Sequence, residues 1–264
     1  MRKYFLNIYR LIFARKFFYK FNHFIFQCSL RGLGILNYEN PKISGEDRFL
    51  REFLRGKRNP VVLDVGANEG TYSRKIIDAN KSSLIYAFEP HPTTYQKLIG
   101  NISSPRFKAI NAAVGCQEGE LNLYDYLSSD GSSHASLYKE VIEVFHRSKS
   151  TAHKVHAINL DQFAKTSSLE IIELLKIDTE GNELNVLNGF REHLISGKIN
   201  AIHFEFNEMN VASRVFFRDF WLLLQGYHLY RLLPDGLMRI HEYDPLLCEL
   251  YAYQNIIALR IIKN

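Results

Sequence analysis

The stretch Val61-Val62-Leu63-Asp64-Val65-Gly66-Ala67-Asn68-Glu69-Gly70 decides the fold of this chain of 264 residues. Its first half is an apolar run of strand-forming residues, and its second half is a glycine-rich turn. Apolar residues on both sides of a short strand fit a parallel sheet that is covered on both faces. Glycines in the turn let backbone amides at the start of the next helix approach a ligand closely. The stretch therefore predicts a nucleoside-binding half-site.

The spacing of the glycines narrows the class of ligand. A dinucleotide-binding turn has the pattern G-x-G-x-x-G, but the position two after Gly66 is Asn68. No dinucleotide is therefore expected. The next predicted strand ends at Glu89, nineteen residues after Gly70. A glycine-rich turn followed by an acid at the end of the next strand suits a cofactor that has a ribose but no phosphate, and S-adenosylmethionine is such a cofactor.

Strands alternate with helices on both sides of the opening stretch. Helices are expected at Glu46 to Arg55, Thr71 to Ala79 and Thr93 to Asn101, and strands at Leu84 to Phe88 and Phe107 to Asn111. Such alternation predicts a parallel sheet with right-handed connections. Ligands are then expected at the carboxyl ends of the strands.

The second half of the chain begins with an interruption of this pattern. Glu120 to Tyr126 alternates like an antiparallel strand and Ser128 to Ser133 predicts a flexible loop, so an insertion is expected on the ligand-binding face. Further elements are expected as a strand at Ile171 to Asp178, a helix at Asn182 to Ile195, a strand at Asn200 to Phe206 and a helix at Val211 to Gln225. Two closing strands are expected at Tyr227 to Leu233 and Asn255 to Ile262, with a turn at Pro234 to Gly236.

The charges divide the chain into two parts. The net charge is +5, yet residues 1–27 hold six basic residues and no acid, which leaves −1 for the remainder. A nearly neutral body argues against a nucleic-acid surface, because phosphate binding needs clustered positive charge. The length suits one large domain. We therefore expect an N-terminal extension at residues 1–45 and one domain at residues 46–264.

The extension is rich in aromatic as well as basic residues. Arg10, Arg15 and Lys16 interrupt every apolar run well short of a membrane span. Neither an unbroken apolar region nor a small-residue cleavage site is present, so a cytoplasmic protein is expected. Two interpretations of the extension stay open. Residues 1–27 lie on the inner face of an anionic membrane, where each basic residue adds about 1 kcal/mol, or they form a helix docked on the domain.

No metal site is expected. Cys28, Cys116 and Cys248 are far apart and have no metal-ligand or disulfide spacing, which indicates a reduced, intracellular protein. Asp178 and Glu205 offer oxygen ligands of the kind that Mg²⁺ accepts, but they lack a ligand spacing.

Four motifs together resemble the FkbM-type family of S-adenosylmethionine-dependent methyltransferases. They are Leu63 to Gly70, Phe88 to Pro92, Asn111 to Gly115 and Leu175 to Glu183, in the order and spacing of the family. The resemblance covers about Pro60 to Phe206. It implies an α/β fold with a doubly wound, Rossmann-like class I methyltransferase sheet, mostly parallel with an antiparallel C-terminal strand, to which a helical N-terminal extension is added here.

Cofactor-binding residues are expected at the ends of the first three strands. The Glu89 carboxylate can accept hydrogen bonds from both ribose hydroxyls. The resemblance implies that Asp64 helps to hold the methionine end, and the alternative is an aspartate that stabilises the turn. Asn68 either adopts a left-handed backbone or contacts the cofactor. The whole expected set is Asp64, Gly66, Ala67, Asn68, Gly70, Glu89, Pro90, Asn111 and Ala112, the last two beside the adenine.

Asp178 and Glu180 end the strand that is expected to face the transferred methyl group. Methyl transfer is an in-line displacement in which the acceptor oxygen lies roughly 3 to 3.5 Å from the methyl carbon and loses its proton. A carboxylate with a raised pKa suits this task, and Asp178, Glu180 and Glu205 are expected to form a cluster. His134 is a rival base. Alternatively, Glu180 caps the helix that begins near Asn182, and Asp178 binds backbone amides or the sulfonium.

These expectations describe a methyltransferase (EC 2.1.1) that transfers a methyl group from S-adenosylmethionine to a hydroxyl, and the resemblance points to sugars of surface glycans. The alternative acceptor is a small-molecule secondary metabolite. A nucleic-acid methyltransferase is disfavoured by the neutral body and by the absence of an Asn-Pro-Pro-Tyr-type motif. A non-enzymatic cofactor-binding protein would keep Glu89 but would need no base. The basic extension fits an enzyme that works on lipid-linked saccharide precursors.

Overall fold

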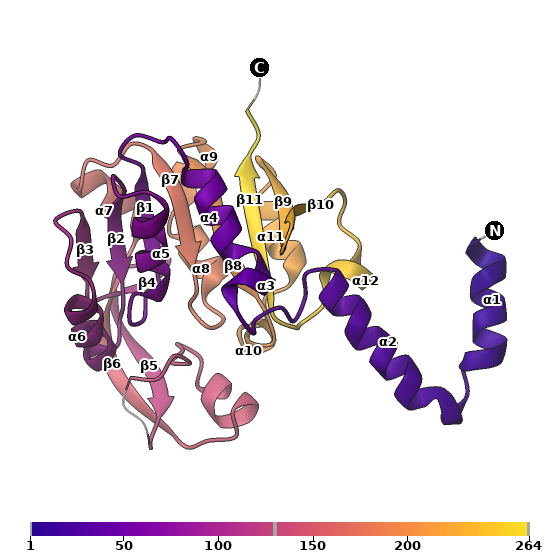
Figure 1. Ribbon diagram of the computed structural model, residues 1–264. Coiled ribbons are helices and arrows are strands. Elements are labelled where there is room, and N and C mark those ends of the chain that lie inside the picture. The colour runs from indigo at the N-terminus through magenta and orange to yellow at the C-terminus, as the bar shows by residue number, and fades with distance from the viewer. Residues whose placement is uncertain (1, 129–130, 263–264) are drawn as a thin grey trace.

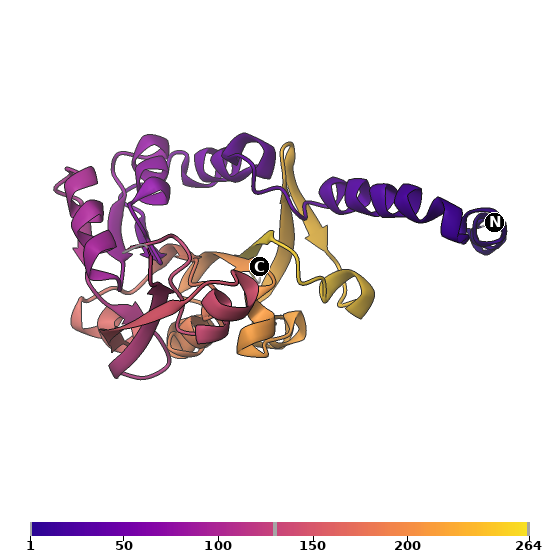
Figure 2. The ribbon, with the colours of Figure 1, turned by 90° about the horizontal axis from the view of Figure 1, so that it is seen from below.

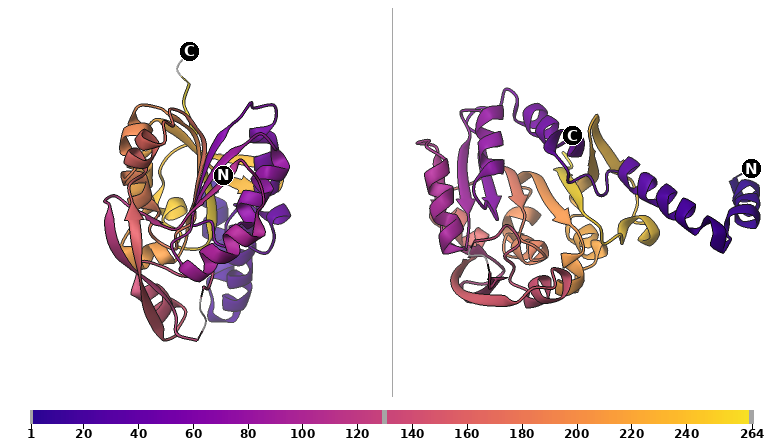
Figure 3. Two further views of the ribbon diagram at one scale, coloured as in Figure 1. Left: turned by 90° about the vertical axis from the view of Figure 1, so that its left-hand side faces the viewer. Right: turned by 60° about the horizontal axis from the view of Figure 1, so that its bottom comes forward.

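The computed structural model describes residues 2–128 and 131–262 (Figure 1). A central sheet of eight strands has helices on both faces, as the left view of Figure 3 shows, and a second, three-stranded sheet lies below it in Figure 1. Two N-terminal helices project from this body. The structure confirms the predicted α/β class, and the helical extension is present.

The strand order of the central sheet is β10-β9-β11-β8-β7-β1-β2-β3. The strands are β1 (Val61–Val65), β2 (Leu84–Phe88), β3 (Phe107–Ile110), β7 (Ile172–Ile177), β8 (Ile199–Phe206), β9 (Tyr227–Leu233), β10 (Gly236–Ile240) and β11 (Gln254–Arg260). The first five pair in parallel, and β11 runs antiparallel to both β8 and β9. This confirms the doubly wound sheet with an antiparallel C-terminal strand. The turn at Pro234 to Gly236 leads into β10, so the chain closes with three strands rather than the two expected.

Successive residues of each central strand serve two separate cores. In β1, Leu63 and Val65 belong to one apolar cluster and Val62 belongs to the other. The helices α4 (Glu46–Leu54), α5 (Thr71–Ala79) and α6 (Pro92–Asn101) pack on the Val62 face, and α7 (Leu160–Thr166), α8 (Glu183–Asn188), α9 (Arg191–Ile195) and α11 (Phe217–Leu223) pack on the other. The apolar run of the opening stretch therefore fills both cores, as a covered parallel strand must.

The insertion forms the second sheet from β4 (Ala113–Val114), β5 (Gly119–Tyr126) and β6 (Ser150–Ile158). β5 pairs antiparallel with β6, which confirms the antiparallel strand expected at 120–126. Neither β6 nor the short helix η2 (Val141–Phe145) nor α7 was expected. Of the predicted loop at 128–133, residues 129 and 130 lie outside the described residues.

Two of the predicted helices are each divided in two. The helix expected at 182–195 is divided into α8 and α9 by Phe190, whose φ of −122° is not helical. Gly189 just before it lies against a neighbouring loop, since a Cβ atom there would come within 2.1 Å of the Gly115 carbonyl oxygen. The helix expected at 211–225 is divided into α10 (Met209–Ser213) and α11. Arg214 between them has a φ of 57°, which ends a right-handed helix. In both cases a residue with non-helical backbone angles separates two short helices.

The N-terminal extension consists of α1 (Arg2–Phe13), η1 (Lys16–Phe18), α2 (Tyr19–Gly32) and α3 (Pro41–Ser44). The two long helices contact each other, since the Tyr9 hydroxyl donates a 2.6 Å hydrogen bond to Asn22. Beyond the end of α2 the chain joins the body, where Ile35 pairs with Gln254 of β11. Figure 2 and the right view of Figure 3 agree that α1 stands off from the domain. Neither helix is therefore docked along the domain, and no helix within the described residues is long and apolar enough to cross a membrane.

Candidate active site

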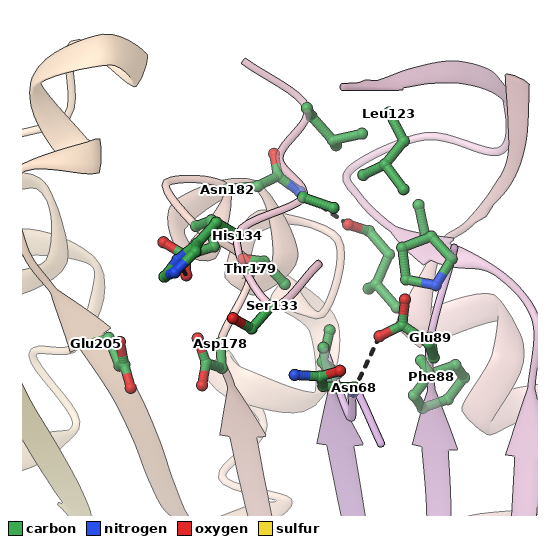
Figure 4. Close-up of a pocket in the computed structure, with 18 of the residues that line it drawn as sticks. Asn68, Phe88, Glu89, Leu123, Ser133, His134, Asp178, Thr179, Asn182 and Glu205 are labelled. Carbon is green, nitrogen blue, oxygen red and sulfur yellow. Dashed lines mark hydrogen bonds and ion pairs between the residues drawn. The ribbon is translucent and has the colours of Figure 1, made fainter. Parts of the chain in front are cut away.

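A pocket of about 480 Å³ opens at the carboxyl ends of β1, β2, β7 and β8, where the strand order reverses (Figure 4). This volume is within the range of small-molecule sites, and this place is the expected one in a doubly wound sheet. Its wall includes Gly66, Asn68, Glu89, Pro90 and Ala112 of the expected cofactor set, and all four expected catalytic residues, Asp178, Glu180, Glu205 and His134. The structure thus brings these residues from six separate segments to one cavity.

The glycine-rich turn after β1 shapes the floor of the pocket. Gly66 has a φ of 78°, and a Cβ atom on it would lie 1.7 Å from the carbonyl oxygen of Asp178. Only glycine allows the ends of β1 and β7 to approach this closely. Asn68 has a φ of 48° and also lines the pocket. The two interpretations of Asn68 are therefore compatible.

Glu89 is held by two backbone amides at the end of β2. The amide of Asn68 donates to Oε2 at 2.9 Å, and that of His91 donates to Oε1 at 2.8 Å. Burial raises the pKa of Glu89 to about 7, although these hydrogen bonds oppose the rise. A carboxylate has about four acceptor positions, so two amides leave room for two hydroxyl donors. The fixed carboxylate in the pocket wall fits a ribose.

Four residues of the expected cofactor set, Asp64, Ala67, Gly70 and Asn111, are not part of the pocket wall. Asp64 is buried and accepts a 2.6 Å hydrogen bond from the Ser73 hydroxyl, and burial raises its pKa to about 6. The Asn111 side chain donates to the backbone carbonyls of Glu89 and Pro90 at 2.8 and 3.0 Å. These contacts support the two strand ends, and direct contact of Asp64 or Asn111 with a cofactor stays a prediction.

Glu180 and His134 face each other in the pocket, with 3.5 Å between Oε1 and Nδ1. Burial raises the pKa of Glu180 to about 7, opposed by the hydrogen bond with His134, and Glu180 in turn raises the pKa of His134. The backbone of Glu180 has a φ of 51°, and its carbonyl accepts a 2.7 Å hydrogen bond from Ser136. Strained residues held in this way cluster at functional sites. Glu180 therefore has the pKa and the placement that proton transfer near neutrality needs.

Glu183, rather than Glu180, stabilises the turn before α8. Its Oε1 accepts hydrogen bonds from the amides of Thr179 and Gly181 at 3.0 and 3.1 Å. The described contacts of the Glu180 carboxylate are to His134 instead. This division leaves Glu180 to the pocket.

A buried pair that the sequence analysis missed organises the loop of His134. Asp125 of β5 is fully buried and accepts the amides of Gly131 and Ser132 at 2.9 and 3.0 Å. Burial would raise the pKa of Asp125, but hydrogen bonds from Ser132, Tyr126 and Gly131 lower it. His91 lies 3.5 Å from the Asp125 carboxylate. The sequence signal that could have revealed this pair is the position of Asp125, an acid on the apolar face of an alternating strand.

Two further residues were missed at the end of the pocket near Glu205. The rings of Tyr38 and Tyr253 line the cavity with their centroids 5.7 Å apart. The Tyr253 hydroxyl donates a 3.1 Å hydrogen bond to Glu205. Tyr38 follows the segment that pairs with β11, because the Leu36 amide donates to the Tyr253 carbonyl at 2.7 Å. A residue of the N-terminal extension therefore helps to build the pocket.

Known proteins share the segment that forms this site. The methyltransferase FkbM domain matches residues 64–232. The 2-O-methyltransferase NoeI of Sinorhizobium fredii is 24% identical over 196 residues, 69% of this chain and 78% of that protein. The methyltransferase sdnD of Sordaria araneosa is 31% identical over 51% of this chain and 61% of its own length. The hexuronic acid methyltransferase AglP of Haloferax volcanii is 26% identical over 58% of this chain and 60% of its own length.

Proposed function

The chain belongs to the FkbM family of S-adenosylmethionine-dependent methyltransferases, and we propose that it methylates a hydroxyl group of a sugar during glycan biosynthesis. The observation that carries the proposal is the pair of Glu180 and His134 in the pocket wall. An alcohol must lose a proton on methylation, and a carboxyl with a pKa of about 7 is matched to that task. Two relatives are named as a 2-O-methyltransferase and a hexuronic acid methyltransferase, which supports a sugar acceptor.

The residues of the pocket divide the work in this proposal. When bound, S-adenosylmethionine supplies an electrophilic methyl group. Glu89 would accept hydrogen bonds from the ribose hydroxyls, and Ala112, which lines the pocket, would lie beside the adenine. Asp178 and Glu205 lie on the side of the pocket away from Glu89 (Figure 4), and there they would face the positively charged part of the cofactor.

Glu180 removes the acceptor proton in the proposed reaction. The O–H bond of the sugar hydroxyl breaks, and the proton moves to the Glu180 carboxylate. The oxygen forms a bond to the methyl carbon while the S–CH₃ bond breaks, which leaves the neutral thioether S-adenosylhomocysteine. His134, whose pKa is raised by Glu180, donates to the carboxylate and holds it in place. Tyr38 and Tyr253 form the wall against which the acceptor ring packs.

An assay of methyl transfer tests the sugar acceptor. The full chain is incubated with S-adenosylmethionine that carries a labelled methyl group, and with free hexoses, free uronic acids or a saccharide-containing lipid extract. We expect label in the carbohydrate fraction that resists mild base, because a methyl ether survives conditions that hydrolyse a methyl ester. Base-labile label would indicate a carboxyl acceptor. Label confined to sugar-free small metabolites would replace the proposal with the secondary-metabolite alternative.

We propose further that α1 and α2 dock on an anionic membrane surface, where a lipid-linked saccharide would be met. Tyr4 of α1 is 73% exposed, and Phe17 of η1, between the two helices, is 88% exposed. The other exposed apolar residues of α1 and α2 include Phe5, Leu6, Leu11, Ile12, Tyr19 and Phe24. The same segment also exposes the basic residues Lys3, Arg10, Arg15, Lys16 and Lys20. Exposed apolar patches mark interaction sites, and basic residues without acids favour anionic lipid.

Removal of positive charge from the extension should weaken vesicle binding. The variant carries Arg10→Gln, Arg15→Gln and Lys16→Gln, and each lost charge is worth about 1 kcal/mol near an anionic surface. Co-sedimentation with phosphatidylglycerol vesicles is expected to weaken on the order of 100-fold. The matched control removes three exposed arginines of the body, by Arg51→Gln, Arg55→Gln and Arg58→Gln. Equal binding by the two triple variants would exclude the extension as the membrane contact.

A further inference from the structure

Lys176 is a buried cation directly behind the pocket. It lies near the carboxyl end of β7 and is 2% exposed. In the sheet register it stands between Asp64 of β1 and His203 of β8, on the face that α4 and α5 cover. A lysine is almost never fully buried unless it is paired, because an unpaired charge in an apolar interior is strongly destabilising. The function of this residue therefore lies in its partners.

The ammonium of Lys176 bridges two carboxylates of the pocket wall. Its Nζ lies 3.3 Å from Asp178 Oδ2 and 3.7 Å from Glu205 Oε1. Asp178 and Glu205 both line the pocket, whereas Lys176 does not. They end neighbouring strands, β7 and β8, on the side of the pocket away from Glu89 (Figure 4). Lys176 thus contacts a ligand only through these acids.

The surrounding charges decide how the two acids ionise. Burial raises the pKa of Glu205, the charge of Asp178 raises it further, and Lys176 opposes both. Burial alone would lower the pKa of Lys176, but Asp178 and Glu205 reverse the direction and raise it. The other titratable groups that face this cluster are Glu46 of α4, Tyr72 and Lys75 of α5, Asp64, Glu180, His203 and Tyr253. Lys176 is the buried cation that contacts Glu205 among the described residues.

We propose that Lys176 is a positioning residue: its ammonium holds Asp178 and Glu205 at the ends of β7 and β8 and keeps negative charge facing the cationic part of S-adenosylmethionine. The inference rests on the assignment of this pocket to that cofactor. The sulfonium of the methyl donor carries a positive charge, and the thioether of S-adenosylhomocysteine does not. Negative charge here therefore favours the methyl donor over the demethylated product, which speeds replacement of one by the other.

Removal of the ammonium should change the pH dependence of this preference. A carboxylate is charged above its pKa, and Lys176→Met takes away the group that lowers the pKa of Glu205. The preference for the methyl donor is then lost at a higher pH than in the wild type. Each pKa unit corresponds to about 1.4 kcal/mol, or a tenfold change in the preference. If Lys176 served packing alone, Lys176→Met would weaken the binding of both ligands equally at every pH.

Calorimetric titration with S-adenosylmethionine and S-adenosylhomocysteine between pH 6 and 9.5 tests the proposal. The ratio of the two affinities cancels the contribution of the ribose and of Glu89, since both ligands share it. In Lys176→Met, the midpoint of this ratio against pH is expected to rise by about one unit. Glu205→Gln is expected to remove that transition, alone and combined with Lys176→Met. The matched control is Lys108→Met, because the Lys108 ammonium also lies over a tyrosine ring, 5.0 Å from that of Tyr86, outside the pocket.

Each outcome has a separate meaning. A wild-type protein that binds neither ligand would overturn the proposed function. If both ligands bind, but the midpoint of the affinity ratio against pH is the same in wild type and Lys176→Met, only this inference would be overturned. A transition that survives Glu205→Gln would also overturn it. If Lys176→Met does not fold, Lys176→Arg restores the charge and is expected to keep the wild-type midpoint. A shifted midpoint in Lys176→Arg would contradict the proposal.

Discussion

Glu89→Ala is expected to weaken the binding of S-adenosylmethionine and S-adenosylhomocysteine at least 100-fold. The carboxylate is 6% exposed and is fixed by the amides of Asn68 and His91. Two ribose hydroxyls would donate to its free acceptor positions, and a hydrogen bond to a charged group contributes about 1.5 to 3 kcal/mol. The loss of two such bonds amounts to about 3 to 6 kcal/mol, and a tenfold change in affinity corresponds to about 1.4 kcal/mol.

The affinity of the wild type should depend on pH through the same carboxylate. Burial raises the pKa of Glu89 to about 7. Its charged form accepts the ribose hydrogen bonds, so binding of both ligands is expected to weaken as the pH falls through about 7. The same raised pKa means that the folded protein binds this proton more tightly than the unfolded chain, so Glu89 disfavours folding above pH 7. Glu89→Ala should therefore not unfold the protein at pH 8.

Calorimetry at pH 8 with wild type, Glu89→Ala and Glu69→Ala measures this effect, with NAD as the ligand control. Glu69 follows Asn68 in the glycine-rich turn after β1, but its side chain is 47% exposed and pairs with Lys97. Glu69→Ala thus removes one carboxylate beside the site without touching the pocket, and it is expected to bind within a few-fold of wild type. Near-normal affinity of Glu89→Ala would exclude Glu89 as the ribose ligand.

The parts of the site that depend on local sequence were predictable. Gly66 and Glu89 are fixed by one turn and one strand end, so their spacing alone placed them. The need for glycine at position 189 was not predictable, because it depends on the carbonyl of Gly115, which lies 74 positions away in the chain. Tyr38 was missed because it, too, depends on a distant contact: it reaches the pocket because its segment pairs with β11.

Lys176 shows where the resemblance stopped helping. It was quoted as part of the motif Leu175 to Glu183, yet nothing local distinguishes a lysine that faces solvent from one that is buried. Its burial depends on α4 and α5, which cover its face of β7, and its second partner, Glu205, comes from β8. β6 was missed for a related reason, because most of its residues are polar and its identity as a strand depends on pairing with β5.

Glu180→Gln is expected to reduce the single-turnover rate of methyl transfer between about 10²-fold and 10⁴-fold at saturating cofactor, which is the usual contribution of a general base. Glutamine keeps the shape of the side chain but cannot accept the proton. Because the pKa of Glu180 is raised to about 7, the wild-type rate should rise with pH until about 7 and then level off. That rise should vanish in Glu180→Gln, while cofactor affinity measured by calorimetry should change little.

His134→Asn separates the two candidate bases. The His134 side chain is 45% exposed, and its Nδ1 lies 3.5 Å from the Glu180 carboxylate. If Glu180 is the base, loss of the imidazole removes only the group that opposes the raised pKa of Glu180, so the rise of rate with pH should move to higher pH and the plateau should fall far less than in Glu180→Gln. A loss in His134→Asn that exceeds the loss in Glu180→Gln would assign the base to His134. An unchanged plateau in Glu180→Gln would exclude Glu180 as the base, because glutamine cannot accept the proton of the acceptor hydroxyl.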